Sequence, residues 1–296
     1  MTEKHLFIFG LGFSGQALAQ RAKGDYATVG GTVRTEEKAA RLRAKGIDAL
    51  VFDGESASDA VVAATRRATH IVQSIAPGSA GDPVITLLRG AILGAEALEW
   101  LGYLSTVGVY GDHGGGWVDE ATEPNPLSSR SVERVRAEME WRILGEERGV
   151  PVALFRLSGI YGPGRNALAQ VMEGTARRLV KPGQVFNRIH VADIATAVAA
   201  GAAQKASGVF NVTDDEPGPP QDVVAFAAGL AGQPAPPEID FATAELSPMA
   251  RSFYGENKRV GNRRLAADLG VKLAFPTYRE GIAALWNDGS WRGSAG

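Results

Sequence analysis

The sequence predicts an α/β fold, a doubly wound parallel sheet with a smaller C-terminal lobe. Apolar, strand-like runs alternate with helix-like stretches from residue 5 to residue 157, which is typical of parallel strands joined by crossover helices. A glycine-rich segment closes the first of these runs and opens the first helix. At 296 residues, the chain is long enough for one large unit of this kind or for two closely joined units.

The first half of the chain is a regular series of strands and helices. Residues 5–10 are apolar and end in glycine, as in a buried parallel strand. Asp82 followed by Pro83 is typical of a helix N-terminus, and Gly149 is typical of a helix end. The expected strands are 5–10, 27–33, 48–52, 71–75, 100–107 and 152–157, and the expected helices are 14–23, 36–45, 58 onward, 83–93 and 129–148.

The pattern is less regular after Gly162. Asp193 is expected to cap a helix, and Thr277 with Glu280 forms a capping box that opens the last helix. Two segments rich in Pro, Gly and acids are expected to be loops, and the last eight residues are expected to be frayed. The expected helices are 167–178, 191–203 and 277–286, the expected strand is 208–212, and the expected loops are 214–220 and 231–237.

Composition and charge exclude several classes of function. The formal charge is −2, with 31 basic and 33 acidic residues, so no broad basic field favours nucleic acid or an anionic membrane. The absence of cysteine excludes disulfides, thiolate metal sites and cysteine nucleophiles, and the four histidines lack zinc-ligand spacing, so no metal is expected. The N-terminus carries no apolar signal region. We therefore expect a cytoplasmic protein, a monomer or homodimer, that acts on a small molecule.

The glycine-rich segment has the spacing of a phosphate-binding loop. Gly10-Leu-Gly12-Phe13-Ser14-Gly15 follows the first strand and opens the first helix, the context in which G-x-G-x-x-G binds a dinucleotide. Gly10 permits the turn, Gly12 lets the backbone approach a pyrophosphate, and Gly15 lets the helix pack on the strand. Residues 1–162 are therefore expected to form an NAD(P)-binding Rossmann domain. Residues 163–296 are expected to form the substrate lobe, with 189–212 returning to the Rossmann core.

Arg34 at the end of the second strand favours NADP(H) over NAD(H). An NAD enzyme usually has an acid there for the ribose 2′-hydroxyl, whereas a guanidinium suits a 2′-phosphate. Asp53, which follows the third strand, is a candidate for the adenine amine, with a turn residue as the alternative. Ser74 and Ala76, at the end of the fourth strand, are also expected to contact the cofactor.

Four motifs in the order and spacing seen here resemble a known family. They begin at Tyr103 (Tyr-Leu-Ser-Thr-Val-Gly-Val-Tyr-Gly), Arg156 (Arg-Leu-Ser-Gly-Ile-Tyr-Gly-Pro-Gly-Arg), Arg188 (Arg-Ile-His-Val-Ala-Asp-Ile) and Gly208 (Gly-Val-Phe-Asn-Val-Thr-Asp-Asp). Together they resemble the extended short-chain dehydrogenases/reductases, in particular the NAD(P)-dependent sugar epimerase/dehydratase branch. The resemblance covers nearly the whole chain.

The resemblance implies a catalytic Ser/Thr and an altered catalytic pair. Thr106, with Ser105 beside it, matches the residue that holds the substrate oxygen in this family. The family then has a Tyr as general acid/base and a Lys four residues later. Counting back from Glu138, which matches the Glu of the family's helix, places Arg130 at the Tyr position and Arg134 at the Lys position. Arginine offers donors and no transferable proton at neutral pH, so it cannot replace tyrosine as acid/base.

Other residues are weaker candidates for the missing proton transfer. Tyr161 usually lines the substrate mouth in the resembled family, with packing as the alternative. Tyr110 and His113 follow the fifth strand, where open α/β sheets bind ligands. The one Tyr-x-x-x-Lys match, Tyr254 to Lys258, lies far beyond that strand and is interpreted as a coincidence.

Two functions are therefore open at this point. The first is an atypical epimerase/dehydratase-like enzyme that acts on a nucleotide-sugar or another anionic substrate. The second is an NADP-binding redox sensor or regulator without turnover, like the NmrA-like proteins. The retained Thr106 and Tyr161 favour the first, and Arg130 with Arg134 favours the second.

Overall fold

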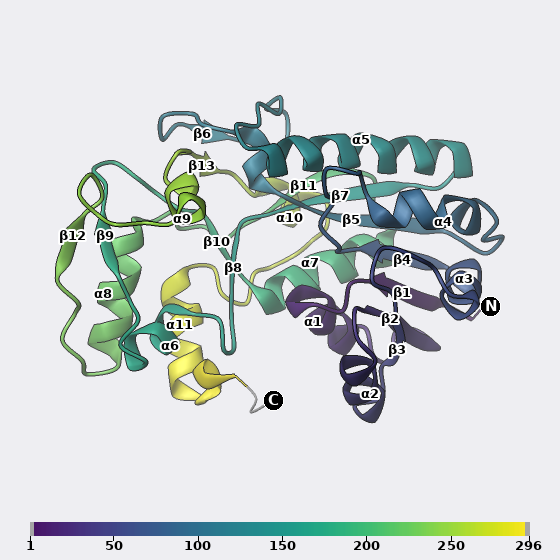
Figure 1. The fold of residues 1–296 in the computed structure, drawn as a ribbon, viewed down its shortest axis with the longest axis horizontal. Coiled ribbons are helices and arrows are strands. Elements are labelled where there is room, and N and C mark those ends of the chain that lie inside the picture. Colours follow the sequence, from purple (N-terminus) through teal and green to yellow (C-terminus); the bar gives the residue numbers. More distant parts are fainter. Residues whose placement is uncertain (1–2, 294–296) are drawn as a thin grey trace.

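A seven-stranded parallel sheet forms the centre of the computed structural model, which describes residues 3–293 (Figure 1). Its strand order is β11-β7-β5-β4-β1-β2-β3, and every neighbouring pair is parallel. From β1 the chain first builds one side of the sheet and then crosses to build the other. The strands are β1 (His5–Phe9), β2 (Thr28–Val33), β3 (Asp48–Val51), β4 (His70–Gln73), β5 (Trp100–Thr106), β7 (Val152–Leu157) and β11 (Gly208–Val212).

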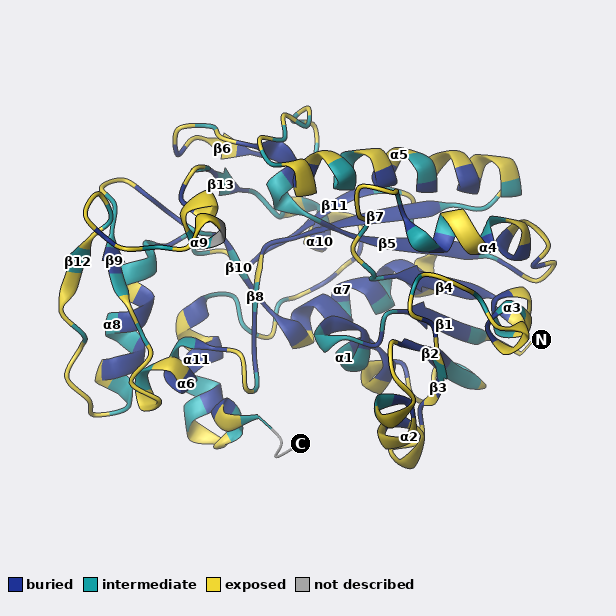
Figure 2. Ribbon diagram, in the orientation of Figure 1, coloured by how far each residue is buried: buried dark blue, intermediate teal, exposed yellow. Residues whose placement is uncertain are grey.

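Helices cover both faces of this sheet, which confirms the predicted doubly wound fold. One apolar core joins the sheet to α1, α2 and α7, and a second joins it to α3, α4 and α5. Figure 2 shows the strands buried and the outward faces of the helices exposed. The helices are α1 (Phe13–Arg21), α2 (Glu36–Ala44), α3 (Asp59–Arg67), α4 (Pro83–Leu93), α5 (Ser129–Arg148) and α7 (Val191–Gln204).

The remaining elements gather beside the sheet. In Figure 1, α6, α8 and α11 lie together on the left, and they share a separate apolar core that includes Leu168, Val223 and Ile282. Three short parallel pairs, β8–β10, β9–β12 and β6–β13, lie outside the central sheet. The elements are β6 (Trp117–Val118), β8 (Gly159–Tyr161), β9 (Arg178–Val180), β10 (Arg188–His190), β12 (Glu238–Asp240), β13 (Arg259–Val260), α6 (Ala167–Met172), α8 (Pro220–Leu230), α9 (Pro248–Phe253), α10 (Arg263–Ala267) and α11 (Tyr278–Asn287), with 3-10 turns η1 (Val107–Tyr110) and η2 (Ser290–Arg292).

Side-chain caps explain why several helices begin where the sequence predicts. Asp82 Oδ1 accepts hydrogen bonds from the backbone N–H of Val84 at 2.9 Å and of Ile85 at 3.4 Å, which fixes the start of α4. Thr277 accepts from the Arg279 N–H and donates its hydroxyl to Glu280, so the predicted residues do cap α11, although through a side-chain bond between them instead of the reciprocal backbone bonds of a capping box.

Three predictions about the second half of the chain were wrong. The helix at 167–178 ends at Met172, because Gly174 turns the chain with a φ of +68° and residues 178–180 form β9. Helix α8 begins at Pro220, inside the predicted loop 214–220, because proline fits the first position of a helix. The last residues are not all frayed, because Trp291 in η2 is buried and stacks on Trp286.

The cap of α7 was also wrongly assigned. The side chain of His190, not Asp193, accepts a hydrogen bond from the Ala192 N–H. Asp193 is buried inside the first turn and accepts from the N–H groups of Ala274 and Phe275 at 2.7 and 3.1 Å. Asp193 therefore ties α7 to the segment that leads into α11.

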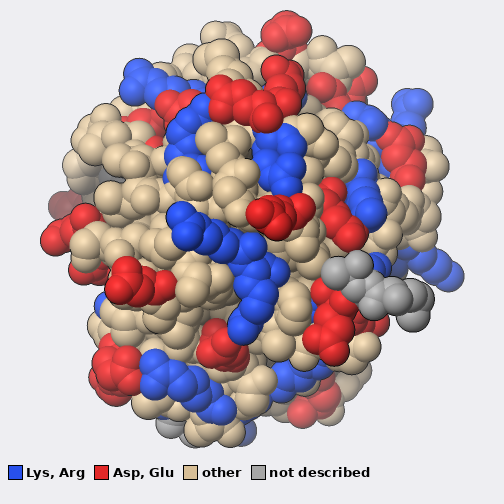
Figure 3. Space-filling model, turned by 90° about the vertical axis from the view of Figure 1, so that its right-hand side faces the viewer, with Lys and Arg blue, Asp and Glu red and all other residues tan. Residues whose placement is uncertain are grey.

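One face of the molecule mixes both signs of charge. Acidic and basic side chains are interspersed over the face shown in Figure 3. Within residues 3–293, no helix is long and apolar enough to cross a membrane. The same residues contain no group of three or more His, Asp or Glu side chains that could hold a metal ion.

Candidate functional site

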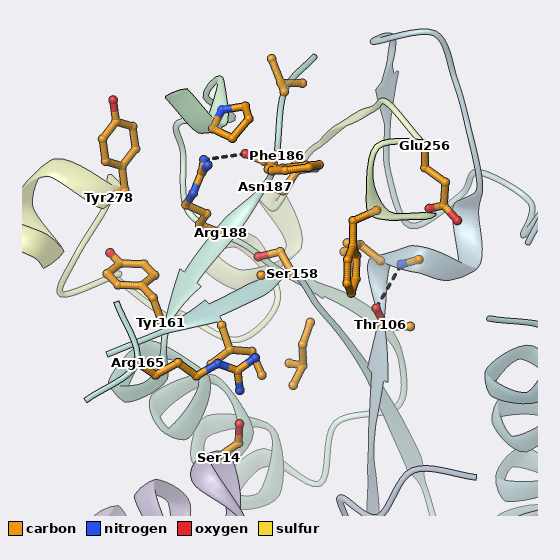
Figure 4. A pocket seen from close by; sticks show the side chains of 18 of the residues that line it. Ser14, Thr106, Ser158, Tyr161, Arg165, Phe186, Asn187, Arg188, Glu256 and Tyr278 are labelled. Carbon is orange, nitrogen blue, oxygen red and sulfur yellow. Dashed lines mark hydrogen bonds between the residues drawn. The ribbon is translucent and has the colours of Figure 1, made fainter. Parts of the chain in front are cut away.

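A cleft of about 870 Å³ lies at the carboxyl edge of the sheet. Ser74, Thr106 and Ser158, which stand at the ends of β4, β5 and β7, line one side of it, and Ser14 at the start of α1 lines it as well (Figure 4). The opposite side is formed by residues of α6, α8, α9 and α11. Open α/β sheets bind ligands in this crevice, beside the point where the strand order reverses.

The glycine loop has the backbone that a dinucleotide pyrophosphate requires. Gly10 has a φ of +90°, and a Cβ on Gly15 would lie 2.3 Å from the Gly10 carbonyl oxygen, so both positions require glycine. A Cβ on Gly12 would meet nothing within 4 Å, so this glycine faces open space. Helix α1 starts at Phe13 without a side-chain cap, which leaves its first N–H groups for a ligand. These residues fit the phosphates of NAD(P).

The other expected cofactor residues stand along the same edge. Arg34 is exposed just beyond β2. Ser74 and Ala76 line the cleft after β4. Asp53 is exposed, and its Oδ1 accepts from the N–H groups of Glu55 and Ser56, which lowers the pKa of its carboxyl group. Asp53 therefore forms a turn, and its contact with the adenine amine stays a prediction.

Thr106 and Ser105 differ in what their hydroxyl groups do. Thr106 lines the cleft, and its Oγ1 accepts from the Gly108 N–H at 3.1 Å (Figure 4). Ser105 is buried and donates to Glu138 Oε1 at 2.5 Å. Glu138 is paired in turn with the buried Arg156 at 2.7 Å. Ser105 is therefore held in an internal network, whereas Thr106 faces the cleft.

Arg130 and Arg134 both line the cleft on α5, with Thr106. Arg134 donates to the Leu104 carbonyl at 2.8 Å and to the Tyr103 hydroxyl at 3.1 Å. The guanidinium of Arg130 lies over the Phe253 ring, 5.5 Å from its centre. Both arginines therefore contact residues that line or adjoin the cleft, and neither offers a proton to transfer at neutral pH.

Of the three weaker candidates, only Tyr161 is among the described residues that line the cleft. Its hydroxyl donates to the Thr277 carbonyl at 3.4 Å, and burial raises its pKa. The Tyr110 hydroxyl is buried and donates to Asn211 at 2.7 Å, and His113 contacts the Tyr110 carbonyl. The structure therefore brings Tyr161, and neither Tyr110 nor His113, to the wall of the cleft.

The buried His190 packs against Tyr161. The rings of Tyr161 and His190 meet edge to face at 5.2 Å, and burial lowers the pKa of His190 to about 4. Burial raises the pKa of Asp214 to about 8, although the charge of Arg188 opposes this shift. Arg188 itself lines the cleft and donates to the carbonyls of Phe186 and Gly218 (Figure 4).

Sequence reasoning did not assign several charged residues that line the cleft. Lys258, part of the motif interpreted as a coincidence, is buried and donates to Glu256 and to the Gly111 carbonyl, both at 2.6 Å. Tyr254 instead packs between the rings of Phe186 and Phe241. The unassigned charged residues are Arg165, Arg177, Arg188, Glu256 and Lys258. These residues reach the cleft through tertiary contacts, which no local sequence pattern predicts.

The parallel sheet, the glycine loop and the cleft at the strand ends define an NAD(P)-binding protein of the Rossmann type. The model of the NAD dependent epimerase/dehydratase family matches residues 6–213. The chain belongs to this family.

Solved structures agree with this assignment. A functionally unknown conserved protein from Silicibacter pomeroyi DSS is 46% identical, with a TM-score of 0.87, and the match covers 97% of this chain and 99% of that one. A protein from Methylobacillus flagellatus assigned as an NAD-dependent epimerase/dehydratase is 26% identical over the same shares, with a TM-score of 0.73. The UDP-glucose 4-epimerase of Thermus thermophilus, solved with NAD, shares the fold at 21% identity and a TM-score of 0.75 over 98% of this chain and 100% of that one.

A curated relative matches only part of the chain. The 3-diazoavenalumate denitrifying reductase of a Streptomyces species is 28% identical over 161 residues. This match covers 50% of the chain and 51% of the reductase, so the chain spans about half the length of that relative.

Proposed function

We propose that the protein is an NADP(H)-dependent oxidoreductase of this family that acts on a small anionic substrate without the usual Tyr/Lys pair. One observation carries the proposal: a single cleft joins the start of α1, Thr106 at the end of β5 and a strongly cationic wall. Five arginines and Lys258 line this cleft, against Glu256 as the one acid among the described lining residues. Such a wall favours phosphate or carboxylate groups, and a nucleotide-sugar carries the former.

The cofactor and substrate roles divide along the cleft. The α1 N-terminus and the glycine loop would hold the pyrophosphate, and Arg34 would hold a 2′-phosphate. The bound nicotinamide supplies the acceptor or donor of a hydride. Thr106 would hold the substrate oxygen. Tyr161 would be the proton donor, since of Tyr161, Tyr110 and His113 it is the one that lines the cleft. We still propose that the chain divides into a cofactor domain, residues 1–162, and a substrate lobe, residues 163–296, with residues 189–212 returning to the cofactor domain.

Cofactor preference tests the first half of this proposal. NADPH should raise the melting temperature more than NADH at equal concentration, because Arg34 can pair with the 2′-phosphate. A tenfold difference in affinity corresponds to about 1.4 kcal/mol at saturating ligand. Arg34→Gln should remove the difference and leave NADH binding unchanged. Equal shifts in the wild type, or a preference for NADH, would reject the role of Arg34.

The second candidate function is a redox sensor that binds NADP(H) without turnover. The occupation of the Tyr and Lys positions by Arg130 and Arg134 favours it, since neither arginine transfers a proton. A panel of nucleotide-sugars and other anionic carbonyl compounds, assayed both through the absorbance of NADPH and by chromatography of the products, separates the two functions, because an epimerisation or dehydration would return the hydride and leave the absorbance unchanged. Oxidation of NADPH or a new product with any member supports the enzyme, whereas tight NADPH binding with no turnover across the panel supports the sensor.

A further inference from the structure

The turn that follows β8 carries Arg165 to the phosphate loop, although about 150 residues separate them in the sequence. The guanidinium carbon of Arg165 lies 5.9 Å from the centre of the Phe13 ring, and Phe13 is the first residue of α1. Arg165 and Ser14 both line the cleft, and Figure 4 shows the Arg165 side chain extending into the cleft above Ser14.

This turn is closed and packs directly on the phosphate loop. The backbones of Gly162 and Arg165 exchange two hydrogen bonds of 3.0 Å. A Cβ on Gly162 would lie 3.2 Å from Phe13 Cζ and 2.7 Å from Val191 Cγ1, so the backbone approaches closely enough to require glycine. The distance from the Arg165 backbone to the loop is therefore fixed by packing.

The C-terminal turn η2 holds the Gly162–Arg165 turn from the other side. Asn166 Nδ2 donates to the carbonyls of Gly162 and Trp291, both at 2.9 Å, and the Gly164 N–H donates to the Trp291 carbonyl at 3.1 Å. Trp291 is buried, so these acceptors are themselves anchored. The position of Arg165 is thus set before any ligand binds.

Arg165 differs from three of the other four arginines of the cleft in what its donors contact, while Arg130, like Arg165, lies over an aromatic ring. Its side chain is exposed, and within residues 3–293 neither the hydrogen bonds nor the ion pairs described above involve its guanidinium. Stacking on Phe13 occupies only a face of the guanidinium plane and leaves the N–H edges for a ligand. By contrast, three of the other cleft arginines donate to backbone carbonyls, namely Arg134 to Leu104, Arg177 to Glu245, and Arg188 to Phe186 and Gly218.

We propose that Arg165 binds the pyrophosphate of the dinucleotide on the side opposite the α1 N-terminus. The helix supplies backbone N–H groups and the positive end of its dipole, and Arg165 supplies a fixed fork of donors that matches two phosphate oxygens. The cofactor would then be held between the two halves of the chain. This inference rests on the cofactor part of the proposed function.

The test compares dinucleotide affinity in variants at exposed positions, where substitution conserves the fold. The dissociation constants of NADPH, NADH and ADP-ribose are measured by calorimetry for wild type, Arg165→Gln and Arg165→Lys. Arg21→Gln is the matched control, because it removes the same charge from the far end of α1, where Arg21 pairs with Asp25 in solvent. 2′-AMP, which lacks the pyrophosphate, is the control ligand.

Arg165→Gln should raise the dissociation constants of NADPH, NADH and ADP-ribose by the same factor, about tenfold, as expected for a charge-assisted hydrogen bond at an exposed site. Arg165→Lys should recover part of the loss, since it keeps the charge and loses the fork. Binding of 2′-AMP should be unchanged in both, and the loss should shrink at high salt.

Three results would overturn the inference, and they have different meanings. If wild type binds the dinucleotides and Arg165→Gln binds them equally well, Arg165 does not contact the pyrophosphate and the proposed function stands. If wild type binds neither NADPH, NADH nor ADP-ribose, the proposed function fails and the inference fails with it. A change confined to NADPH and absent for ADP-ribose would place Arg165 elsewhere on the cofactor and would also reject the inference.

Discussion

At the residue scale, the feature on which stability depends most sharply is the buried ion pair of Arg156 and Glu138, next to the end of β5. Arg156 donates to both carboxylate oxygens of Glu138, at 3.1 and 2.7 Å, and its guanidinium lies 4.8 Å from the centre of the Tyr110 ring. Ser105 donates to the same carboxylate. A buried pair of this kind adds little net stability when complete, but an unpaired buried charge is costly. The network therefore fixes the end of β5, on which Thr106 stands.

Glu138→Ala should lower the free energy of unfolding by about 3–5 kcal/mol, because it leaves the buried guanidinium of Arg156 without a counter-charge. Urea denaturation gives the value. Glu147→Ala is the control on the same helix, since the Glu147–Arg89 pair is partly exposed and its loss should cost less than about 1 kcal/mol. Equal losses in the two variants would contradict this account of the network.

The buried His190 should make stability depend on pH. Its pKa is about 4 in the folded protein, against an ordinary value of 6.5, because burial disfavours the charged ring. Between these values the unfolded chain binds more protons, so the stabilisation is complete above pH 6.5 and is lost as pH falls toward 4. From about pH 7 to about pH 4.5 this amounts to roughly 2–3 kcal/mol.

His190→Asn isolates that contribution, since an amide oxygen can still accept from the Ala192 N–H. The variant should lose less unfolding free energy than wild type over the same acid range, measured by denaturation at each pH. Asp214 is present in both proteins, so its opposite dependence, with a pKa raised to about 8, cancels in the comparison. Parallel pH profiles would show that His190 is not the source.

At the scale of elements, Asp82 connects a helix start to the sheet. Its carboxylate accepts from the first N–H groups of α4, from Gln73 Nε2 at 2.8 Å and from Trp141 Nε1 at 3.0 Å. Trp141 lies on α5, so a single side chain joins α4, α5 and β4.

Asp82→Ala should therefore lower the free energy of unfolding by about 3 kcal/mol, more than an ordinary cap, because it leaves several buried donors unsatisfied. Ser58→Ala is the matched control. Ser58 caps α3 at an exposed position, where its Oγ accepts one hydrogen bond from the Val61 N–H, and the loss of this cap should cost about 1 kcal/mol. Chemical denaturation of both variants gives the comparison.

Elements were predictable from the sequence where a local signal decides them. Asp82-Pro83 marks the start of α4, and Gly149 marks the end of α5 with a φ of +73°. Strands β9 and β12 were missed because only their pairing with each other, between segments far apart in the sequence, makes them strands. Asp193 was misassigned because its buried carboxylate serves a distant segment, residues 274–275, that no helix-start pattern includes.

At the scale of the whole molecule, the two parts of the site were not equally predictable. The glycine loop and Thr106 are local motifs at strand ends, and both stand at the cleft as the sequence indicated. Arg165, Arg188 and Lys258 come from the second half of the chain and reach the cleft through turns held by long-range hydrogen bonds. The sequence shows that these residues are basic, but it does not predict that they line the same cleft.

The same long-range contacts predict that the end of the chain supports cofactor binding. Turn η2 supplies the Trp291 carbonyl to Gly164 and Asn166, which fix the turn that carries Arg165 against Phe13. A chain that ends after Gly289 should lose about 3 kcal/mol of unfolding free energy, because it exposes the surface that the buried Trp291 covers. It should also bind NADPH about tenfold more weakly, the same loss that is expected for Arg165→Gln.

A double variant, the truncated chain carrying Arg165→Gln, tests whether the truncation weakens NADPH binding through Arg165. If the truncation acts on NADPH through Arg165, then adding Arg165→Gln to the truncated chain should weaken NADPH binding little further, because the two changes remove the same contact. Arg292→Gln is the control. It removes a side chain that stacks on Trp291 but keeps the Trp291 carbonyl, so the Kd of NADPH should be unchanged. Additive losses of affinity would show that the C-terminal turn contributes to cofactor binding by a route that does not pass through Arg165.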